Sequence, residues 1–250
     1  GGAPLAKEIE EFFFAANIFI AQGYGLTETS PMGSCNCPAY FKFGTVGKPI
    51  DQNHVKIAED GEILIKGPNV FKGYYNKPEA TQEAMTEDGY FKTGDIGEID
   101  EDGFLRITDR KKDIIVTANG KNIAPQLIES RVGQDYYVEQ IAVFGDKQKY
   151  LTALIVPAFP ALEEYAKAKG IKYTDISDLV KKPEIIQLIR DRIDGQSKDL
   201  ARHEKIAKFT LMDRMFTIED GEMTPSNKLK RKVIAQRYAD VIQKMYEEEE

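Results

Sequence analysis

Tryptophan is absent from this 250-residue sequence, and cysteine and histidine are scarce, with two residues of each. Cys35 and Cys37 are separated by a single residue, so a disulfide between them would be strained. With only His54 and His203 available, the sequence lacks the ligands of a His/Cys metal site. Two thiols without a disulfide framework indicate a reducing compartment, and we expect a cytoplasmic protein.

Long apolar runs and a basic excess are also lacking. No apolar run reaches the roughly 20 residues that a membrane-spanning helix requires. The formal charge is −7, from 34 basic and 41 acidic residues. This balance argues against general binding to nucleic acids or anionic membranes, because both need a basic surface. The 42% hydrophobic and 30% charged content predicts an ordinary globular protein with one large or two smaller domains.

The first hundred residues predict a helix followed by a small β-rich region. Apolar residues at helical spacing indicate an amphipathic helix over residues 5–16, and NIFIAQ, residues 17–22, is expected to be a short buried strand. From residue 44 to residue 108 the pattern changes to short strands and turns. Hairpins are expected around Asp60-Gly61 and Asp102-Gly103, where apolar residues alternate on both sides of the turn.

The charged segment TDRKKD, residues 108–113, indicates a domain boundary between two apolar strands. Helices are expected after it near 125–132, 159–170, 183–202 and 231–246, with strands at EQIAVFG, YLTALIVPA and IAKFTLMD. Helices and strands mixed in this way predict an α+β domain of ordinary size.

The loop QGYGLTETS, residues 22–30, is rich in glycine, hydroxyl and charge. Tyr24 could offer a stacking face to a nucleotide base. Thr27 could donate to a phosphate oxygen, and Glu28 could hold Mg²⁺, which prefers oxygen ligands. A glycine-rich turn in which Tyr24 packs and the Thr-Glu pair caps a helix explains the same residues equally well.

Three later segments carry further candidates. Asp95 in GYFKTGDIG could accept both hydroxyls of a ribose, although an isolated Gly-Asp is more often a turn that bonds its own backbone. Arg110 in TDRKKD could reach a ribose or a phosphate, whereas Lys111 is expected to be a solvated linker residue. Lys228 in EMTPSNKLKRK could bridge a carboxylate and a phosphate, although a basic run of this kind is usually a solvated helix start.

Taken together and in order, these segments resemble the adenylate-forming superfamily of acyl-CoA synthetases, luciferases and peptide-synthetase adenylation domains. The resemblance covers essentially the whole chain and is carried by GGAPL, QGYGLTE, GEILIKGPNVFKGYYN, GYFKTGD, DRKKDIIVTANGKNIAP and TPSNKLKRK. RITDRKKDIIV and TPSNKLKRKVI are most similar to long-chain fatty acyl-CoA synthetases. Such enzymes use ATP to convert a carboxylate into an acyl-adenylate and pyrophosphate, and then transfer the acyl group to coenzyme A.

The resemblance implies a fold that combines α/β and α+β parts. Residues 1–108 would be the end of the large adenylate-forming domain, with a small β-subdomain over 44–108. Residues 109–112 would form a hinge, and residues 113–250 a smaller, mobile α+β C-terminal domain.

The same resemblance implies roles for residues in the first part of the chain. Tyr24 would lie against adenine, Thr27 would contact the α-phosphate, and Glu28 would bind Mg²⁺. Asp95 would hold the ribose hydroxyls, with Arg110 beside them. The adenine and acyl pocket would be lined by Gly1, Gly2, Ala3, Pro4, Gln22, Gly23, Tyr24 and Gly25.

In the second part, Lys112 matches the hinge position about which the C-terminal domain rotates. Lys228 matches the lysine that bridges the substrate carboxylate and the α-phosphate during adenylation. The turn that would lie near coenzyme A during thioester formation consists of Ala118, Asn119, Gly120 and Lys121. The implied cofactors are ATP or AMP, Mg²⁺ and coenzyme A, and the implied partners are these molecules and a fatty acid, not nucleic acid.

The family's Ser/Thr/Gly-rich phosphate loop is not in this sequence, which opens on GGAPLAKEIEEF. We therefore expect the C-terminal part of a long-chain fatty acid–CoA ligase that is inactive by itself. The alternatives are an aryl-CoA ligase, an enzyme that transfers to an acyl-carrier protein, or a non-catalytic nucleotide-binding module; Glu28, Asp95 and Lys228 together speak against the last. The sequence leaves open self-association of the fragment and peripheral contact of the parent enzyme with the inner membrane.

Overall fold

The computed structural model describes residues 5–247 of the chain. The chain divides into two compact units, Gly1–Asp113 and Ile114–Glu250, called unit 1 and unit 2 below. The expected residues Gly1, Gly2, Ala3 and Pro4 lie outside the described residues. Helices account for 30% of the structure and strands for 24%, so the molecule is a mixed helix and sheet protein.

Unit 1 contains two antiparallel sheets. A three-stranded sheet consists of β1 (Gly23–Tyr24), β2 (Ser34–Cys35) and β3 (Lys48–Pro49), and a four-stranded sheet consists of β4 (His54–Ile57), β5 (Glu62–Lys66), β6 (Phe91–Ile99) and β7 (Leu105–Arg110). Buried Ile63, Ile65 and Leu105 form a core cluster with Tyr24. The glycine-rich loop is thus attached to the larger sheet through the packed ring of its own tyrosine.

Both expected hairpins are confirmed. Strands β4 and β5 pair antiparallel across the turn at Asp60-Gly61, and β6 and β7 pair across the turn at Asp102-Gly103. Gly61 and Gly103 have positive φ angles of 84°, a conformation that glycine adopts at low cost. These local turn signals were sufficient to predict the strands on either side.

The N-terminal helix forms as α1 (Lys7–Ala15), but its apolar residues do not face the interior. Phe12 is 69% exposed, whereas Glu10 is buried and its Oε2 accepts a hydrogen bond from the Gly44 backbone N–H at 2.7 Å. Burial raises the pKa of Glu10, and the bond from Gly44 opposes that rise. This polar contact links the helix to the segment around Gly44, where Phe14 also makes ring contacts with Phe41 and Phe43.

The expected strand over NIFIAQ is wrong. Asn17 has a φ of 60° and ends the helix, Ile18 is exposed, and residues 18–22 form neither helix nor strand. A strand requires a neighbour with which to exchange backbone hydrogen bonds. Pairing begins only at β1, inside the glycine-rich loop, where Gly23 and Tyr24 face Cys35 and Ser34.

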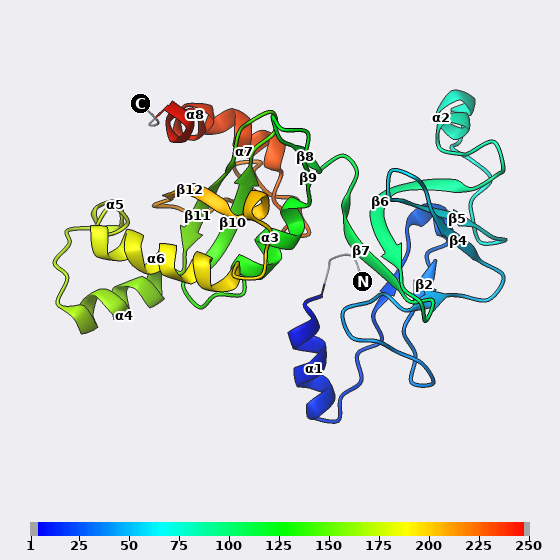
Figure 1. Cartoon of the computed structure of the whole chain (residues 1–250), viewed down its shortest axis with the longest axis horizontal. Helices are drawn as coiled ribbons and strands as arrows, with labels where there is room; N and C mark the ends of the chain where they lie inside the picture. The colour runs from blue at the N-terminus through cyan, green and yellow to red at the C-terminus, as the bar shows by residue number, and fades with distance from the viewer. Residues whose placement is uncertain (1–4, 248–250) are drawn as a thin grey trace. The chain divides into compact units, whose positions relative to one another are not determined.

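Unit 2 is built around a three-stranded sheet of β10 (Val138–Phe144), β11 (Leu151–Pro157) and β12 (Ile206–Leu211), with β11 in the centre. All seven residues of β11 are buried, because helices cover both faces of the sheet. One face packs on α3 (Pro125–Val132), α4 (Phe159–Lys169) and α6 (Pro183–Gln196), and the other on α7 (Arg231–Arg237) and α8 (Ala239–Glu247) (Figure 1).

The remaining elements are short. They are α2 (Pro78–Glu83), α5 (Ile176–Leu179), the two-stranded pair β8 (Ile115–Val116) and β9 (Asn122–Ile123), and the 3₁₀ helices Thr27–Thr29 and Arg202–Glu204.

The helix over 125–132 and the three strands of unit 2 are confirmed, and two helix predictions need correction. Helix α6 ends at Gln196 rather than at residue 202. The expected single helix over 231–246 is interrupted at Tyr238, between α7 and α8. The hydroxyl of Tyr238 donates to Glu222 Oε1 at 3.1 Å, so this residue is held by the loop that precedes α7.

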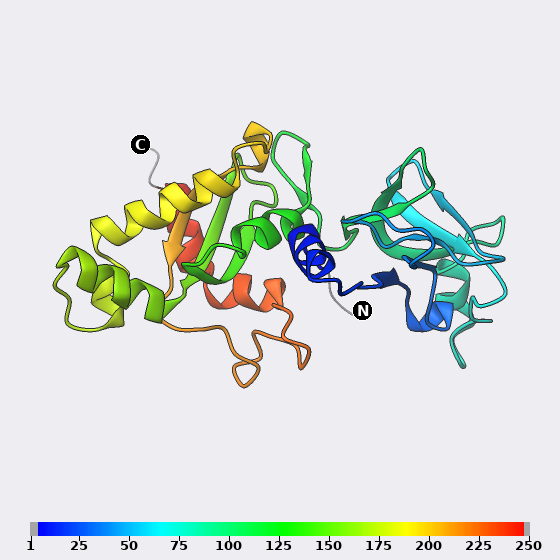
Figure 2. The ribbon, with the colours of Figure 1, turned by 90° about the horizontal axis from the view of Figure 1, so that it is seen from below.

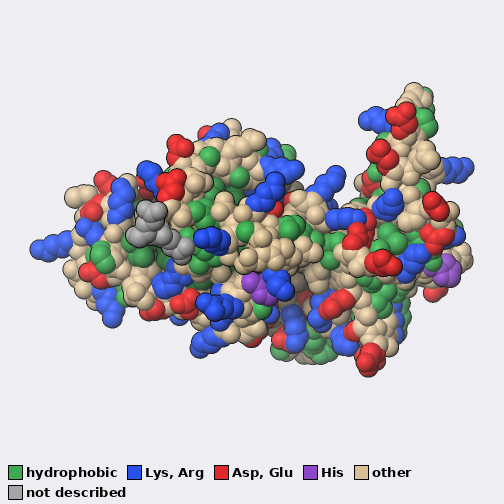
Figure 3. Space-filling view, turned by 45° about the horizontal axis from the view of Figure 1, so that its top comes forward, with side chains coloured by type: hydrophobic (Ala, Val, Ile, Leu, Met, Phe, Trp, Pro, Cys, Tyr) green, Lys and Arg blue, Asp and Glu red, His purple; other side chains and the backbone are tan. Residues whose placement is uncertain are grey.

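The surface is mixed in charge. In the view of Figure 3, Lys and Arg side chains lie interspersed with Asp and Glu side chains on each unit. Among residues 5–247, no helix combines the length and the apolar character needed to cross a bilayer.

Candidate functional site

The loop QGYGLTETS turns back tightly on the segment that follows it. A Cβ atom on Gly25 would lie 1.6 Å from the Pro31 carbonyl oxygen, and one on Gly23 would lie 3.0 Å from Met32 Sδ. The Gly33 N–H donates to the Tyr24 carbonyl at 2.7 Å and closes the return. Only glycine at position 25 permits this close approach of two backbone segments.

Tyr24, Asp95 and Arg110 form one contact network. The Tyr24 hydroxyl donates to Asp95 Oδ2 at 2.6 Å, and Arg110 Nε donates to Asp95 Oδ1 at 3.1 Å. Arg110 lies opposite Asp95 in the register of β6 and β7, which explains how the arginine reaches the carboxylate. Two charge-assisted bonds therefore orient both oxygens of Asp95.

The Tyr24 phenol and the Asp95 carboxylate are both buried. Tyr24 is 8% exposed and Asp95 is 5% exposed. Burial of the phenol and the adjacent Asp95 carboxylate raise the pKa of Tyr24 far above its ordinary value, so Tyr24 remains a hydrogen-bond donor at neutral pH. The Tyr24 ring packs in the core cluster, as the alternative interpretation of this loop expected. The Asp95 carboxylate accepts a hydrogen bond from the distant Tyr24, so it does more than bond the backbone of its own turn.

Thr27 and Glu28 lie on the 3₁₀ helix that follows. The Thr27 side chain is exposed and Glu28 is half-buried. The Tyr74 hydroxyl donates to Glu28 Oε1 at 2.9 Å, and the Phe71 N–H donates to the Glu28 carbonyl at 2.8 Å. Tyr74 belongs to the segment GYYN, which carried part of the resemblance but from which we expected no functional residue.

The described residues contain no group of three His, Cys, Asp or Glu side chains that could enclose a metal ion. Protein-bound Mg²⁺ usually takes one or two carboxylates together with substrate phosphates and water. Glu28 is half-buried next to the exposed hydroxyl of Thr27, so it fits the requirement for a single protein carboxylate.

Gln22 begins the same loop and fixes its position. Its Nε2 donates to the Thr45 carbonyl at 2.9 Å, while its buried Oε1 has no hydrogen-bond partner among residues 5–247. Gln22, Gly23, Tyr24 and Gly25 are therefore the part of the expected pocket wall that the structure describes.

The charged boundary is anchored more firmly than we expected. Lys111 is exposed, as expected of a solvated residue, but its Nζ also lies 2.6 Å from Asp60 Oδ2 and 2.8 Å from Glu62 Oε2. These two partners raise the pKa of Lys111. Lys112, the expected hinge residue, is exposed and precedes the division between the units at Asp113.

Lys228 lies on the irregular segment between β12 and α7, which projects from unit 2 (Figure 2). Its side chain is exposed. The Thr224 N–H donates to the Lys228 carbonyl at 2.8 Å, and the Lys228 N–H donates to Thr224 Oγ1 at 3.0 Å. These two bonds close a compact turn that presents the lysine to solvent.

A buried glutamate anchors the base of this turn. Glu222 is fully buried, and its carboxylate lies 2.7 Å from Arg214 Nη2 and 2.9 Å from Arg237 Nη1. Its carbonyl accepts from the Lys230 N–H at 2.7 Å. Glu222 was not among the expected site residues, and its only signal in the sequence was an acidic residue at the start of an otherwise basic segment.

The turn Ala118–Lys121 also belongs to unit 2. Its four residues are exposed, and Gly120 has a φ of 70° that suits glycine. The Thr117 N–H donates to the Lys121 carbonyl at 3.0 Å. The structure therefore shows an accessible turn at the position where we expected one.

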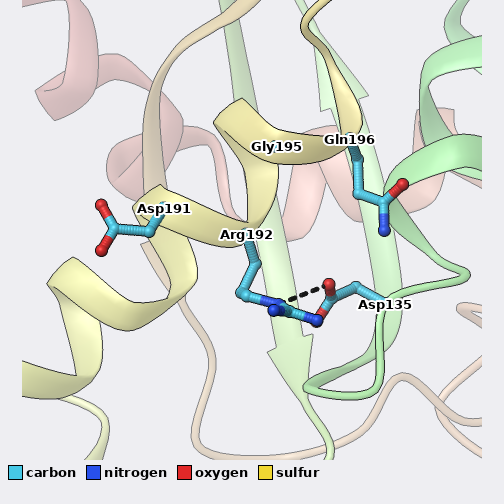
Figure 4. Close-up of a pocket in the computed structure, with 5 residues that line it drawn as sticks. All are labelled: Asp135, Asp191, Arg192, Gly195 and Gln196. Carbon is cyan, nitrogen blue, oxygen red and sulfur yellow. Dashed lines mark hydrogen bonds and ion pairs between the residues drawn. The ribbon is translucent and has the colours of Figure 1, made fainter.

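A pocket of about 170 Å³ lies elsewhere in unit 2 (Figure 4). It is lined by Asp135, Asp191, Arg192, Gly195 and Gln196. Arg192 Nε donates to the buried Asp135 Oδ2 at 2.7 Å, and Asp135 Oδ1 accepts from the Tyr137 N–H at 3.0 Å. Both carboxylate oxygens of Asp135 thus have protein partners, and none of the expected site residues lines this pocket.

Known families match both ends of the chain. A family model described as "AMP-binding enzyme" matches residues 1–75, and one described as "AMP-binding enzyme C-terminal domain" matches residues 112–250. Long-chain-fatty-acid–CoA ligase FadD15 of Mycobacterium bovis is 42% identical over the whole of this chain and 42% of its own length. Long-chain-fatty-acid–CoA ligase ACSBG2 of Xenopus laevis is 33% identical over 99% of the chain and 37% of its own length.

Solved structures give the same picture. The adenylation domain of a carboxylate reductase from Mycobacterium chelonae aligns with a TM-score of 0.79 and 26% identity over 99% of this chain and 38% of that one. An O-succinylbenzoate coenzyme A synthetase from Bacillus subtilis in complex with AMP aligns with a TM-score of 0.68 and 30% identity, over 93% of this chain and 44% of that one. The expected α/β and α+β fold class is confirmed, and the chain spans less than half of the length of these relatives.

Proposed function

Because this chain belongs to the family of AMP-binding enzymes, we propose that it acts as part of an AMP-forming long-chain fatty acid–CoA ligase. The observation that carries the proposal is 42% identity over the entire chain to a ligase of that name. In such a reaction a carboxylate oxygen attacks the α-phosphorus of ATP, and the bond to pyrophosphate breaks. The thiol sulfur of coenzyme A then attacks the acyl carbon, and AMP leaves.

In this proposal the nucleotide lies against the network of Tyr24, Asp95 and Arg110. Each oxygen of Asp95 accepts one protein hydrogen bond and has a second lone pair. The two ribose hydroxyls can donate to those lone pairs, with Arg110 beside them. The geometry supports this proposal, because Tyr24 and Arg110 already orient the Asp95 carboxylate in the absence of a ligand. Binding therefore has to pay little entropy to order this side chain.

The triphosphate would be held by the loop that follows Tyr24. Thr27 is exposed and can donate its hydroxyl to the α-phosphate, and Glu28 would be the protein ligand of a Mg²⁺ ion. When bound, that ion neutralises charge on the phosphates. Thr27 would orient the α-phosphate and Glu28 would hold the ion, while Gly25 allows the backbone to make the return that places both residues.

In the second unit, Lys228 would bridge the substrate carboxylate and the α-phosphate during adenylation, and Ala118, Asn119, Gly120 and Lys121 would lie near coenzyme A during thioester formation. Residues 1–108 would then be the end of the adenylation domain, 109–112 the hinge and 113–250 the mobile domain. The matched families, which end at residue 75 and begin at residue 112, support this assignment.

The proposal predicts that Lys228→Ala slows the first half-reaction selectively. A positioned cation that stabilises charge in a transition state typically contributes about 10²–10³ in rate. We expect ATP–pyrophosphate exchange with a long-chain fatty acid to fall by that factor. The assay uses a protein that contains this chain and is as long as its relatives. Thioester formation from preformed acyl-adenylate should change far less, and Lys230→Ala, which removes a neighbouring exposed lysine, serves as the control.

Equal losses in both half-reactions would remove Lys228 from its assigned role. A second candidate function is transfer of the acyl group to a carrier protein, which the similarity to a carboxylate reductase adenylation domain favours. Exchange assays with long-chain, aryl and short-chain acids, followed by acyl transfer to coenzyme A or to a carrier domain, separate the two. Exchange with none of the acids would contradict both.

A further inference from the structure

The loop after β5 lies directly against the turn that carries Glu28. Asn69 Nδ2 donates to the Thr29 carbonyl at 2.7 Å, and the Phe71 N–H donates to the Glu28 carbonyl at 2.8 Å. The first bond joins the side-chain amide of Asn69 to the backbone of the turn, and the second joins two backbone groups. The hydroxyl of Tyr74 differs, because it donates to Glu28 Oε1, on the side chain, at 2.9 Å.

The surroundings of Tyr74 hold its hydroxyl in place. The ring packs edge-on against Phe71, with the centroids 4.8 Å apart, and Tyr74 is 37% exposed. Within the described residues, Oε2 of Glu28 makes no hydrogen bond or ion pair, so one carboxylate oxygen is occupied and the other is available.

We propose that Tyr74 is a positioning residue for Glu28: its phenol holds Oε1 and thereby directs Oε2 toward the divalent cation that accompanies the nucleotide. This inference rests on the proposed function, which assigns Glu28 to that cation. Carboxylates that bind metals are themselves commonly hydrogen-bonded, and loss of such a partner costs about 10–100-fold in metal affinity. Because Tyr74 provides a single hydrogen bond and is partly exposed, we expect its loss to lower the metal affinity by about tenfold, the lower end of this range.

The chain supplies a matched pair of variants. Tyr74→Phe removes the hydroxyl and keeps the ring contact with Phe71, while the bonds from Asn69 and Phe71 still attach the loop. Tyr75→Phe removes the same atom from the adjacent residue, which is 90% exposed. Glu28→Gln tests the assignment of the cation itself.

The experiment measures the thermal unfolding midpoint of the full-length protein with saturating AMP while Mg²⁺ is titrated. Ligand binding to the folded state stabilises it in proportion to the logarithm of ligand concentration over Kd, so a tenfold weaker site needs tenfold more Mg²⁺ for the same shift. We expect Tyr74→Phe to need about tenfold more Mg²⁺. Tyr75→Phe should match the wild type, and Glu28→Gln should abolish the shift.

Two other outcomes are distinguishable. If Glu28→Gln keeps the Mg²⁺-dependent shift, the assignment of Glu28 in the proposed function is wrong, and this inference fails with it. If Glu28→Gln abolishes the shift but Tyr74→Phe needs no more Mg²⁺ than the wild type, the role of Tyr74 alone is overturned. A lower midpoint of Tyr74→Phe without Mg²⁺, at unchanged Mg²⁺ requirement, would likewise identify a purely structural tyrosine.

Discussion

At the scale of single residues, Asp95 depends on the donors that surround it. Tyr24→Phe removes one charge-assisted hydrogen bond from this buried carboxylate, and such bonds contribute about 1.5–3 kcal/mol. We expect the free energy of unfolding to fall by about 2 kcal/mol and KM for ATP to rise more than kcat falls. Urea unfolding and ATP–pyrophosphate exchange measure the two effects.

Tyr246→Phe is the matched control for this prediction. Its hydroxyl is partly buried but contacts neutral groups of unit 2, Thr152 Oγ1 at 3.0 Å and the Tyr150 carbonyl at 3.4 Å. It should cost about 1 kcal/mol, as a neutral hydrogen bond does, and leave KM for ATP unchanged. An unchanged KM in Tyr24→Phe as well would mean that Asp95 does not need its tyrosine to bind the nucleotide.

The sequence predicted residue types better than residue partners. Asp95 and Arg110 follow from strand register once the hairpin at Asp102-Gly103 is placed, so their contact was within reach of the sequence. Tyr24 lies 71 positions from Asp95, and no local pattern links the two. Tyr74 and Glu222 were missed for the same reason, because the value of each depends on a partner that only the fold brings near.

At the scale of elements, Glu222 links the loop of Lys228 to α7. Burial opposes the charge on this carboxylate, but hydrogen bonds from Arg214 and Arg237 outweigh burial and hold its pKa below the ordinary 4.5. A carboxyl with a depressed folded-state pKa adds stability above pH 4.5 that is lost as the pH falls through the folded-state pKa. Unit 2 should therefore lose stability in acid partly through this one group.

We expect Glu222→Gln to flatten the acid limb of the stability curve. The free energy of unfolding, measured in urea from about pH 7 down to about pH 3, should fall less steeply in this variant than in the wild type below the ordinary pKa of glutamate. Glu219→Gln, which changes a nearby exposed glutamate, should reproduce the wild-type slope. Identical slopes for all three proteins would show that Glu222 is not ionised in the fold as described.

Elements with strong local signals were predicted well, and those that depend on distant contacts were not. Pro125 at the first position of α3 and the glycines of the two hairpins act through their own backbone angles. In contrast, α1 has the apolar spacing of a core helix, yet its buried contact is Glu10 on the Gly44 N–H. Periodicity measures which residues can share a face, not which face the rest of the molecule covers.

At the scale of the whole molecule, the proposed hinge, residues 109–112, lies just before the division between the two units at Asp113. Arg110 is bound to Asp95, and Lys111 to Asp60 and Glu62, so both residues are attached to unit 1. In the described structure, the Lys112 N–H donates no backbone hydrogen bond. Rotation about Lys112 would leave those side-chain contacts in place, as the proposed hinge requires, and would open the turn that the Asp113 N–H closes on the Arg110 carbonyl at 2.9 Å.

Lys112→Pro tests that hinge directly. Proline fixes φ near −65° and also restricts the residue before it, which is Lys111. Since Lys112 donates no backbone bond, the substitution should leave the folded units intact, with an unfolding midpoint close to that of the wild type. If the two half-reactions require different orientations of the mobile domain, one of them should slow by at least about tenfold, a barrier increase of about 1.4 kcal/mol, while the other persists.

Lys112→Ala removes the same side chain but leaves φ free, so it should support both half-reactions, measured as ATP–pyrophosphate exchange and as thioester formation from acyl-adenylate. Equal rates of both half-reactions in Lys112→Pro would move the hinge away from this residue, because a fixed φ at the pivot cannot leave a rotation about it unaffected.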